Sequence, residues 1–536
     1  MPRKDRKNRR QEASQWRVVT DCTPKDVPEW RGIIPEAQSV REPIEYFREL
    51  YDHEILEHIV SQSNLYATQN NPSKPLKLDK NELERFLGSL YLMSLVKLTK
   101  TRLYWSGKFE LHSISEYFSR SRWEQIKRFL HFNDNSAEPE RNDSNRDKLY
   151  KVRPLIEHLV LKFRKIPKSQ CCCIDEMIVP FKGSSSLKQY TPSKPHKWSF
   201  KIFALCDVSG LLYDFHIYDG PLKPVEGEPD LGASSNIVLQ LAKTIPVGAN
   251  YLLFYDNWFT APHLMANLAK KQIYSLGTVR QNRLKGVTSV LPSDKEMMKK
   301  ARGSYVEAVA SYDGEELRAL KWYDTRCVTL LTSFSSASPL SKCNRYDKKA
   351  RKDIEIQCPK MIEVYNKEIG GVDLMDSLVA LYRIQIRSHK FYHKIFFFLL
   401  DVGLVNAWLL YRRDADSLRI PKAAQHQLQS FKLLVANSLL KQHKEIAQKP
   451  VGRPSASSVG NAHIAKKRRG HNTHDIPEEN IRKDSVGHWP MIMQGTERPR
   501  CKMPNCNGRT NVYCNKCNVN LCFKKEKNCF YMFHHI

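Results

Sequence analysis

The fold is decided by a strand-like stretch that carries an acid at its centre, Cys173-Ile174-Asp175-Glu176-Met177-Ile178-Val179-Pro180. Two other acidic contexts lie far along the chain. Asp256 follows the apolar run 253–255, and Asp373 and Asp376 lie three residues apart in a helical pattern. We expect the first two carboxylates at or near strand ends and the last two on one helix face. Carboxylates that converge in a fold can hold two Mg²⁺ or Mn²⁺ ions, so these four are candidate catalytic residues.

A single aspartate near a strand end is more often a cap, a turn residue or part of a solvated face. Two features favour metal ligands here. Each acid interrupts or follows an apolar run, where a buried charge needs a partner. The chain also carries 86 Lys and Arg against 57 Asp and Glu, a net charge of +29 that indicates a polyanionic partner, most simply nucleic acid. An acidic membrane surface is the alternative partner, but no basic amphipathic helix with a clear apolar face stands out.

The chain of 536 residues predicts two to four structural units. No uninterrupted apolar run reaches membrane-spanning length, and the nearest candidate, Ile395–Leu410, contains Asp401 and Asn406 and is expected to be a buried helix. The basic N-terminus lacks a following apolar region, so we expect no secretory signal. Six of the 14 cysteines fall in the last 36 residues with metal-like spacing, which indicates an intracellular protein with a zinc module.

Periodicity predicts an α/β arrangement with a mixed sheet, preceded by helices from about residue 40. The expected elements of the sheet region are strands 171–181, 200–207 and 211–218, helix 236–244, strand 251–255, helix 262–270 and strand 273–279. Segment 285–360 interrupts this rhythm with strands 306–311 and 317–334, which predicts an inserted β-rich subdomain. The expected later helices are 361–379, 391–411 and 428–444.

The acids and their neighbours resemble the piggyBac transposase family. The motifs that carry the resemblance are Asp175–Gly183, Tyr190–Trp198, Asp256–Thr260, Tyr365-Asn366-Lys367, Gly370-Gly371-Val372-Asp373 with Asp376, Tyr382-Arg383, Ser388–Tyr392 and Asn406-Ala407-Trp408. They span roughly residues 40–440, and the C-terminal cysteine module continues the match. Two departures from the family pattern, at Ser184 and Ser199, fall in the first motif region and leave the acids intact.

The resemblance implies an RNase H-like catalytic core of the acidic-triad kind, interrupted by an insertion domain. Asp175, Asp256 and Asp373 would be the triad that holds catalytic Mg²⁺, with Asp376 as a fourth acid. In such enzymes water activated by two metals nicks DNA, the freed 3′-hydroxyl forms a hairpin, and the excised end joins a TTAA target. Beside the second acid, we expect Trp258 to pack in the core and Asn257 to orient the carboxylate.

With that resemblance, the sequence predicts eight segments in order. They are a basic, disordered N-terminal arm (1–39), the first part of a helical dimerisation and DNA-binding domain (40–168), the first part of the catalytic core (169–284), an insertion domain (285–360), the last core helix (361–379), the second part of the helical domain (380–445), a basic linker (446–487) and a cysteine-rich zinc-binding domain (488–536).

The cysteine module offers eight candidate zinc ligands, His488, Cys501, Cys506, Cys514, Cys517, Cys522, Cys529 and His534. Close Cys and His pairs within about 50 residues are typical of zinc, and eight ligands predict two Zn²⁺ ions bound in an interleaved manner. The alternative of free or disulfide-paired cysteines is disfavoured by the short spacing. The resemblance implies that a His five residues after a Cys closes such a module, which favours His534 over His535 as the partner of Cys529. It also implies that the module binds transposon-end DNA.

Basic and aromatic residues near the acids are candidate DNA contacts, with lysines holding phosphates while an aromatic face meets a base. The candidates are Lys182, Lys188, Tyr190, Lys194, Lys197, Trp198, Arg280, Arg283, Arg387 and Lys390. A solvated strand edge guarded by lysines is the alternative. In the linker, Arg453 lies in a Gly-Arg-Pro triplet like the core of an AT-hook, and 466–469 (KKRR) predicts nuclear localisation or, alternatively, a plain charge run.

Three functions remain open on this evidence. The first is a homodimeric cut-and-paste DNA transposase that acts on double-stranded transposon ends. The second is a domesticated, non-catalytic DNA- or chromatin-binding protein on the same fold, and the third is a nuclease that cuts without joining. The full set of acids favours an enzyme, because a protein retired from catalysis has no physical need for these carboxylates.

Overall fold

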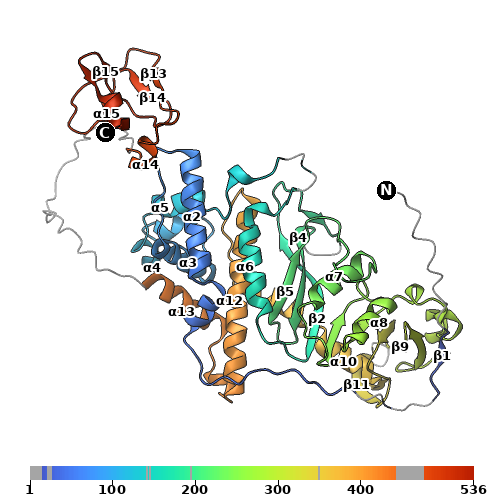
Figure 1. Ribbon diagram of the computed structural model, residues 1–536. Coiled ribbons are helices and arrows are strands. Elements are labelled where there is room, and N and C mark those ends of the chain that lie inside the picture. The colour runs from blue at the N-terminus through green and yellow to red at the C-terminus, as the bar shows by residue number, and fades with distance from the viewer. Residues whose placement is uncertain are drawn as a thin grey trace. The chain divides into compact units, whose positions relative to one another are not determined.

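The computed structural model describes residues 15–20, 24, 27–140, 143, 146–192, 196–347, 351–441 and 476–535. The chain divides into two units (Figure 1). The first comprises Met1–Tyr51 and Leu155–Lys432, and the second Asp52–Pro154 and Leu433–Ile536. The finer division into eight segments stays a prediction.

The first unit holds most of the regular structure. Its strands are β1 (Arg17–Val18), β2 (Cys171–Pro180), β3 (Gln189–Tyr190), β4 (Trp198–Asp207), β5 (Leu212–Ile217), β6 (Tyr251–Tyr255), β7 (Ile273–Thr278), β8 (Tyr305–Tyr312), β9 (Glu315–Tyr323), β10 (Cys327–Thr332), β11 (Ser341–Asp347) and β12 (Lys352–Cys358). Its helices are α1 (Pro43–Leu50), α7 (Ala233–Ala242), α8 (Pro262–Lys270), α9 (Asp294–Met297), α10 (Lys360–Glu368), α11 (Gly371–Leu381) and α12 (Phe391–Ser417), while α6 (Arg153–Arg164) and α13 (Leu428–Lys441) cross the boundary between units.

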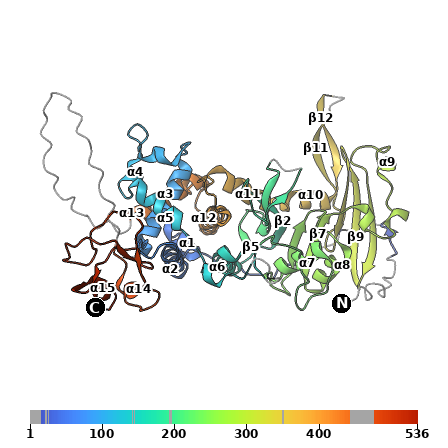
Figure 2. The ribbon, with the colours of Figure 1, turned by 90° about the horizontal axis from the view of Figure 1, so that it is seen from above.

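A ten-stranded mixed sheet organises this unit. Its order is β1-β8-β9-β10-β7-β6-β2-β4-β3, with β5 also paired to β4. Strand β6 runs parallel to both β2 and β7, and β4 runs antiparallel to β2. All five residues of β6 are buried, as expected for a central strand with both faces covered. Figure 2 shows α10 and α11 on one face of the sheet and α7 and α8 on the other. The predicted mixed α/β fold is confirmed.

Helix α12 is long and apolar enough to cross a membrane, but 94% of its most apolar window is buried inside the structure. Asp401 and Asn406, the two polar residues that interrupt its apolar stretch, have specific partners. The side chain of Asn406 accepts a hydrogen bond from the backbone N–H of Leu212 (2.7 Å) and donates to its carbonyl (2.9 Å). Asp401 forms a buried ion pair with Lys432 (3.0 Å) and accepts from the backbone N–H of Ile384 (2.8 Å). These partners confirm the expectation of a buried helix.

Part of the predicted disordered arm is ordered, which corrects that prediction. Strand β1 pairs with the edge strand β8, and Trp16 is 7% exposed with its indole N–H donating to the carbonyl of Lys285 (3.0 Å). Trp30 packs edge-on against Tyr251 at 5.9 Å between ring centroids. The buried Trp16, the half-buried Trp30 and the pairing with a sheet edge together outweigh the polar composition of the segment. Residues 1–14, with most of the basic charge, lie outside the described residues.

The predicted insertion and the helix after it also differ in detail from the expectation. Strands β8, β9 and β10 extend the main sheet, because β10 pairs with β7, and β11 and β12 form a hairpin of their own. The single strand expected at 317–334 is two strands joined by a turn. The single helix expected at 361–379 is divided into α10 and α11 around Gly370, which has a non-helical backbone (φ −77°, ψ 1°).

The second unit is helical before the cysteine module. Its elements are α2 (His53–Asn70), α3 (Lys80–Leu95), α4 (His112–Ser115), α5 (Arg120–Phe129), α14 (Glu479–Arg482), β13 (Pro490–Ile492), β14 (Val512–Cys514), β15 (Phe523–Lys524), β16 (Lys527–Asn528) and α15 (Cys529–His535). Trp123 is fully buried, and its indole N–H donates to the hydroxyl of Ser89 (2.8 Å). A Cβ on Gly88 would lie 2.8 Å from the carbonyl oxygen of Ala436, so α3 and the end of α13 need glycine there to approach so closely.

The buried ion pair on α12 generates a stability prediction. Replacing Asp401 with Ala leaves the Lys432 ammonium buried without its carboxylate, and we expect a loss of about 3–5 kcal/mol in the free energy of unfolding. Urea denaturation measures this. Glu355→Ala is the control, because its pair with Lys342 is largely exposed (59% and 73%) and its loss should cost less than about 1 kcal/mol. Equal effects of the two changes would contradict the prediction.

Candidate active site and metal centres

The first two acids meet because β2 and β6 are neighbouring parallel strands. Ile174 lies opposite Tyr255 in the register, so the residues that follow them, Asp175 and Asp256, reach the same edge of the sheet. A one-residue shift of this register would turn one of the carboxylates to the other face. The expectation of two acids at or near strand ends holds for Asp256, which directly follows β6, but Asp175 lies in the middle of β2, just past the last residue that pairs with β6.

Helix α11 brings the third acid. A Cβ on Gly371 would lie 1.9 Å from the carbonyl oxygen of Asp207 and 2.9 Å from Sγ of Cys173, so the start of α11 presses directly on β4 and β2. Cys173 and Asp175 point to the same side of β2, because side chains alternate along a strand. Asp175 therefore faces the first turn of α11, where Asp373 lies.

The other two carboxylates act electrostatically on Asp175. Burial, together with the negative charges of Asp256 and Asp373, raises the pKa of Asp175 to about 6, although the backbone N–H of Glu176 donates to Asp175 Oδ1 (2.7 Å) and opposes the rise. Like charges held together at the edge of a core are the arrangement that a divalent cation relieves. The donor set, oxygen atoms from three carboxylates, suits Mg²⁺ or Mn²⁺.

The fourth acid has a different environment. Asp376 lies one turn further along α11 and forms an ion pair with Arg383 (3.4 Å).

The sequence assigned no role to Tyr365 on α10, whose hydroxyl lies 3.5 Å from that of Thr278. Burial, together with the charges of Asp256 and Asp175, raises the pKa of Tyr365 to about 12, so this phenol stays protonated beside the acids. Only the packing of α10 on β2 and β7 places it there.

The loop after β6 holds Asp256 by its own backbone. The N–H of Trp258 donates to Asp256 Oδ1 (2.8 Å), and the hydroxyl of Thr260 donates to the Asp256 carbonyl (2.9 Å). The ring of Trp258 stacks on Phe203 at 5.5 Å, which supports the expected packing role. Arg283, a predicted DNA contact, donates from Nη1 to the carbonyl oxygens of three residues of this loop.

The other predicted DNA contacts lie in several places. Tyr190 and Trp198 are about half exposed on the β3–β4 hairpin with ring centroids 4.9 Å apart, and Lys188 Nζ lies 4.6 Å from the Trp198 ring centroid. The exposed candidates are Lys182, Lys197, Arg280 and Arg387, while Lys390 is half-buried beside Tyr392 (5.6 Å). Lys194, Arg453 and the predicted localisation signal at 466–469 lie outside the described residues.

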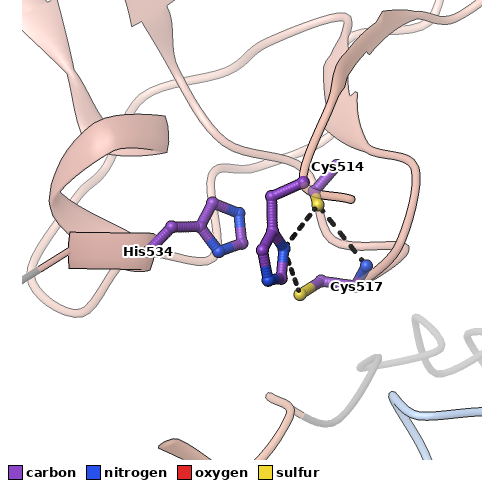
Figure 3. A group of neighbouring side chains, drawn as sticks. Cys514, Cys517 and His534 are labelled. Atoms are coloured by element: carbon purple, nitrogen blue, oxygen red, sulfur yellow. Dashed lines mark hydrogen bonds between the residues drawn. The ribbon is translucent and has the colours of Figure 1, made fainter. Parts of the chain in front are cut away.

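The cysteine module gathers all eight predicted ligands into two groups of four. Within each group the ligand atoms lie within 4.8 Å of one another. One group is His488, Cys514, Cys517 and His534 (Figure 3), and the other is Cys501, Cys506, Cys522 and Cys529. The members alternate along the chain, so the two groups are interleaved. His534 belongs to the first group, which corrects its expected pairing with Cys529.

The histidines of the first group are oriented for a metal. His488 Nδ1 lies 3.4 Å from the sulfurs of both Cys514 and Cys517, while its Nε2 lies 2.9 Å from Asp484 Oδ1. His534 Nδ1 lies 2.9 Å from the carbonyl oxygen of Arg482, and its Nε2 is buried with no hydrogen-bond partner among the described residues. One ring nitrogen bonded to an oxygen and the other directed at the group is the usual arrangement of zinc-binding histidines. His535 is exposed and stacks on Tyr531 at 4.4 Å.

Comparison with known proteins identifies the family. A family model described as Transposase IS4 matches residues 42–408, a range that includes all four acids. The human piggyBac transposable element-derived protein 3 is 29% identical over 494 residues, which cover 90% of this chain and 75% of that protein. The chain belongs to the piggyBac transposase family.

Other members of the piggyBac family agree with this assignment. The human piggyBac transposable element-derived protein 2 is 28% identical over 491 residues, covering 89% of this chain and 75% of that protein. A cryo-EM structure of a piggyBac transposase synaptic complex with hairpin DNA superposes with a TM-score of 0.63 at 18% identity, covering 91% of this chain and 98% of that one. At that identity the superposition establishes a shared fold.

The raised pKa of Asp175 predicts that the acid site lowers the free energy of unfolding by an amount that depends on pH. The folded pKa of about 6 lies above the ordinary value of 3.8, so the stabilisation by the protonated form is complete below about pH 4 and is lost as pH rises through 6. Asp175→Asn stays neutral and avoids this loss. In EDTA we expect the variant to exceed wild type in unfolding free energy by about 1–3 kcal/mol at pH 7.5, and to equal it near pH 4.

Urea denaturation at the two pH values measures the difference. Asp353→Asn, an exposed change on β12, is the matched control and should show no such pH dependence. A variant that is less stable than wild type at pH 7.5 in EDTA would contradict the repulsion between the acids.

Proposed function

We propose that this chain is a DNA transposase of the piggyBac type, which excises DNA through a hairpin intermediate and joins it to TTAA targets. The observation that carries the proposal is the convergence of Asp175 in the middle of β2, Asp256 directly after the neighbouring parallel strand β6, and Asp373 in the first turn of α11. These three carboxylates would hold two divalent cations, Mg²⁺ or Mn²⁺. When bound, such ions activate a water nucleophile and stabilise the leaving oxygen of a phosphodiester.

The sheet supports an RNase H-like core for this chemistry. The strand order β5-β4-β2-β6-β7, antiparallel through β4 and parallel through β6 and β7, presents the Asp175 and Asp256 positions at one edge. Helix α11 closes over that edge with Asp373. Fixed secondary structure, rather than mobile loops, thus holds two of the three acids, which is how a metal site keeps its geometry. We further propose that 285–360, between Asp256 and Asp373, is the family's insertion domain.

Double-stranded DNA is the proposed partner. The net charge of +29 supplies phosphate attraction. The exposed rings of Tyr190 and Trp198 lie on the β3–β4 hairpin beside Lys188, and Lys182 and Lys197 are exposed nearby in the sequence, a combination that fits a DNA backbone with an unpaired base. The structure similar to this chain by fold is described as a synaptic complex with hairpin DNA. A homodimer acting in the nucleus is part of the same proposal.

A second candidate function is a domesticated DNA- or chromatin-binding protein. The observation that favours it is the naming of the similar human proteins as transposable element-derived. Both functions predict DNA binding, and only the transposase predicts strand cleavage. Excision and strand-transfer products therefore separate them.

The catalytic assignment predicts loss of excision in Asp256→Asn. The amide removes one negative ligand, so we expect excision of DNA flanked by the element's own terminal repeats, in Mg²⁺, to fall at least about a thousandfold. Asp353→Asn should retain wild-type excision. A gel assay for excised and joined products measures both, and wild-type excision in Asp256→Asn would refute the site. Hydrolysis without joining would indicate a nuclease instead.

The two ligand groups predict two Zn²⁺ ions per chain. His534→Ala removes a ligand of the first group, so we expect its zinc content to fall to about one ion per chain, while His535→Ala retains two. Elemental analysis of protein purified without added metal measures this independently of activity. Fewer than two ions in wild type, or equal loss in both variants, would contradict the grouping.

A further inference from the structure

The residue Arg283 binds the loop that carries Asp256. It ends a short 3-10 helix, η5 (Gln281–Arg283). Its Nη1 donates to the carbonyl oxygens of Asn257 (2.7 Å), Trp258 (3.0 Å) and Thr260 (3.0 Å). One guanidinium nitrogen thus engages three of the four residues that follow the acid.

This contact completes a set of hydrogen bonds that fix the loop. Within the loop, Asp256 accepts from the Trp258 N–H through its carboxylate and from the Thr260 N–H and hydroxyl through its carbonyl (3.2 and 2.9 Å). These bonds use two N–H groups and one hydroxyl of the loop, whereas Arg283 binds carbonyl oxygens of the same loop.

The segment that presents Arg283 is itself held by a buried lysine on β9. Lys321 is fully buried, and its Nζ donates to Gln281 Oε1 (2.9 Å) and the Pro292 carbonyl (2.7 Å) and pairs with Asp294 (2.6 Å). The Gln281 amide in turn donates to the Leu291 carbonyl (3.1 Å). A fully buried ammonium is retained only with such a complete set of acceptors. Strand β9 of the 285–360 segment therefore holds η5 in place.

We propose that Arg283 is a positioning residue for the metal site, which sets the orientation of Asp256, and that Lys321 and Gln281 set the orientation of Arg283. The inference rests on the proposed function for its catalytic consequence. It also gives segment 285–360 a role besides any contact with DNA. Arg280, exposed three residues earlier, lacks these contacts among the described residues and is the matched comparison.

The experiment compares Arg283→Ala, Arg283→Lys and Arg280→Ala in the full chain. Hydrogen exchange of the Trp258 and Thr260 amides reports the loop, Mn²⁺ titration reports the cation site, and DNA affinity at several salt concentrations reports phosphate contacts. In Arg283→Ala we expect at least about tenfold faster exchange and about tenfold weaker Mn²⁺ binding, with DNA affinity within about twofold. Arg283→Lys should recover part of both losses.

Arg280→Ala is expected to behave in the opposite way. In this variant the hydrogen exchange of the loop amides and the Mn²⁺ affinity should match wild type. The DNA affinity should fall, and the slope of log affinity against log salt concentration should become shallower by about one, the loss of one released counterion. If Arg283→Ala follows this second pattern, with unchanged loop exchange, Arg283 is a phosphate contact and the inference is overturned.

Two further comparisons keep the test decisive. If Arg283→Ala does not fold, Gln281→Ala removes only the support and should accelerate exchange at the same amides to a smaller degree. Unchanged exchange in Gln281→Ala would overturn the inference. If wild type cuts no DNA while Arg283→Ala still loosens the loop, the positioning role stands and the proposed transposase activity fails.

Discussion

The parallel pairing of β2 with β6 is the constraint on which the acidic site depends. Its register sets Ile174 against Tyr255 and delivers two aspartates to one edge of the sheet. It also turns Cys173 and Asp175 toward α11, where Gly371 allows a close approach to the sheet. The backbone arrangement of β2, β6 and α11 therefore brings together three acids that lie far apart in the sequence, and it does not depend on contacts between their side chains.

Such a site works against the stability of the fold that builds it. Burial of Asp175 and the negative charges of Asp256 and Asp373 both disfavour its ionised form, and its raised pKa expresses that cost. The surrounding structure is correspondingly rigid. Backbone N–H groups bind Asp175 and Asp256, and Arg283 holds the adjacent loop. Strained or repulsive local arrangements persist where the neighbouring structure fixes them, and here the β-sheet and its extension supply that support.

The sequence predicted what depends on local pattern. Strand 251–255, helix 262–270 and the eight clustered ligands follow from periodicity and spacing, and the structure contains them. Long-range pairing could not be predicted in this way. The edge strand at Arg17, the addition of β8–β10 to the main sheet and the contact of Arg283 with a loop 25 residues earlier depend on tertiary partners. The family resemblance likewise favoured His534 as a ligand but paired it with Cys529, which belongs to the other group.

The interleaving of the two ligand groups has a thermodynamic consequence. His488 and His534 bound the module, and both cysteine pairs of the second group lie between ligands of the first. Binding of a metal ion at one centre therefore lowers the entropy cost of forming the other, because part of the loop-closure entropy of the second site has already been lost. The two centres of the wild-type module should consequently fill with positive cooperativity, so chains that carry a single ion should be rarer than two independent sites would give.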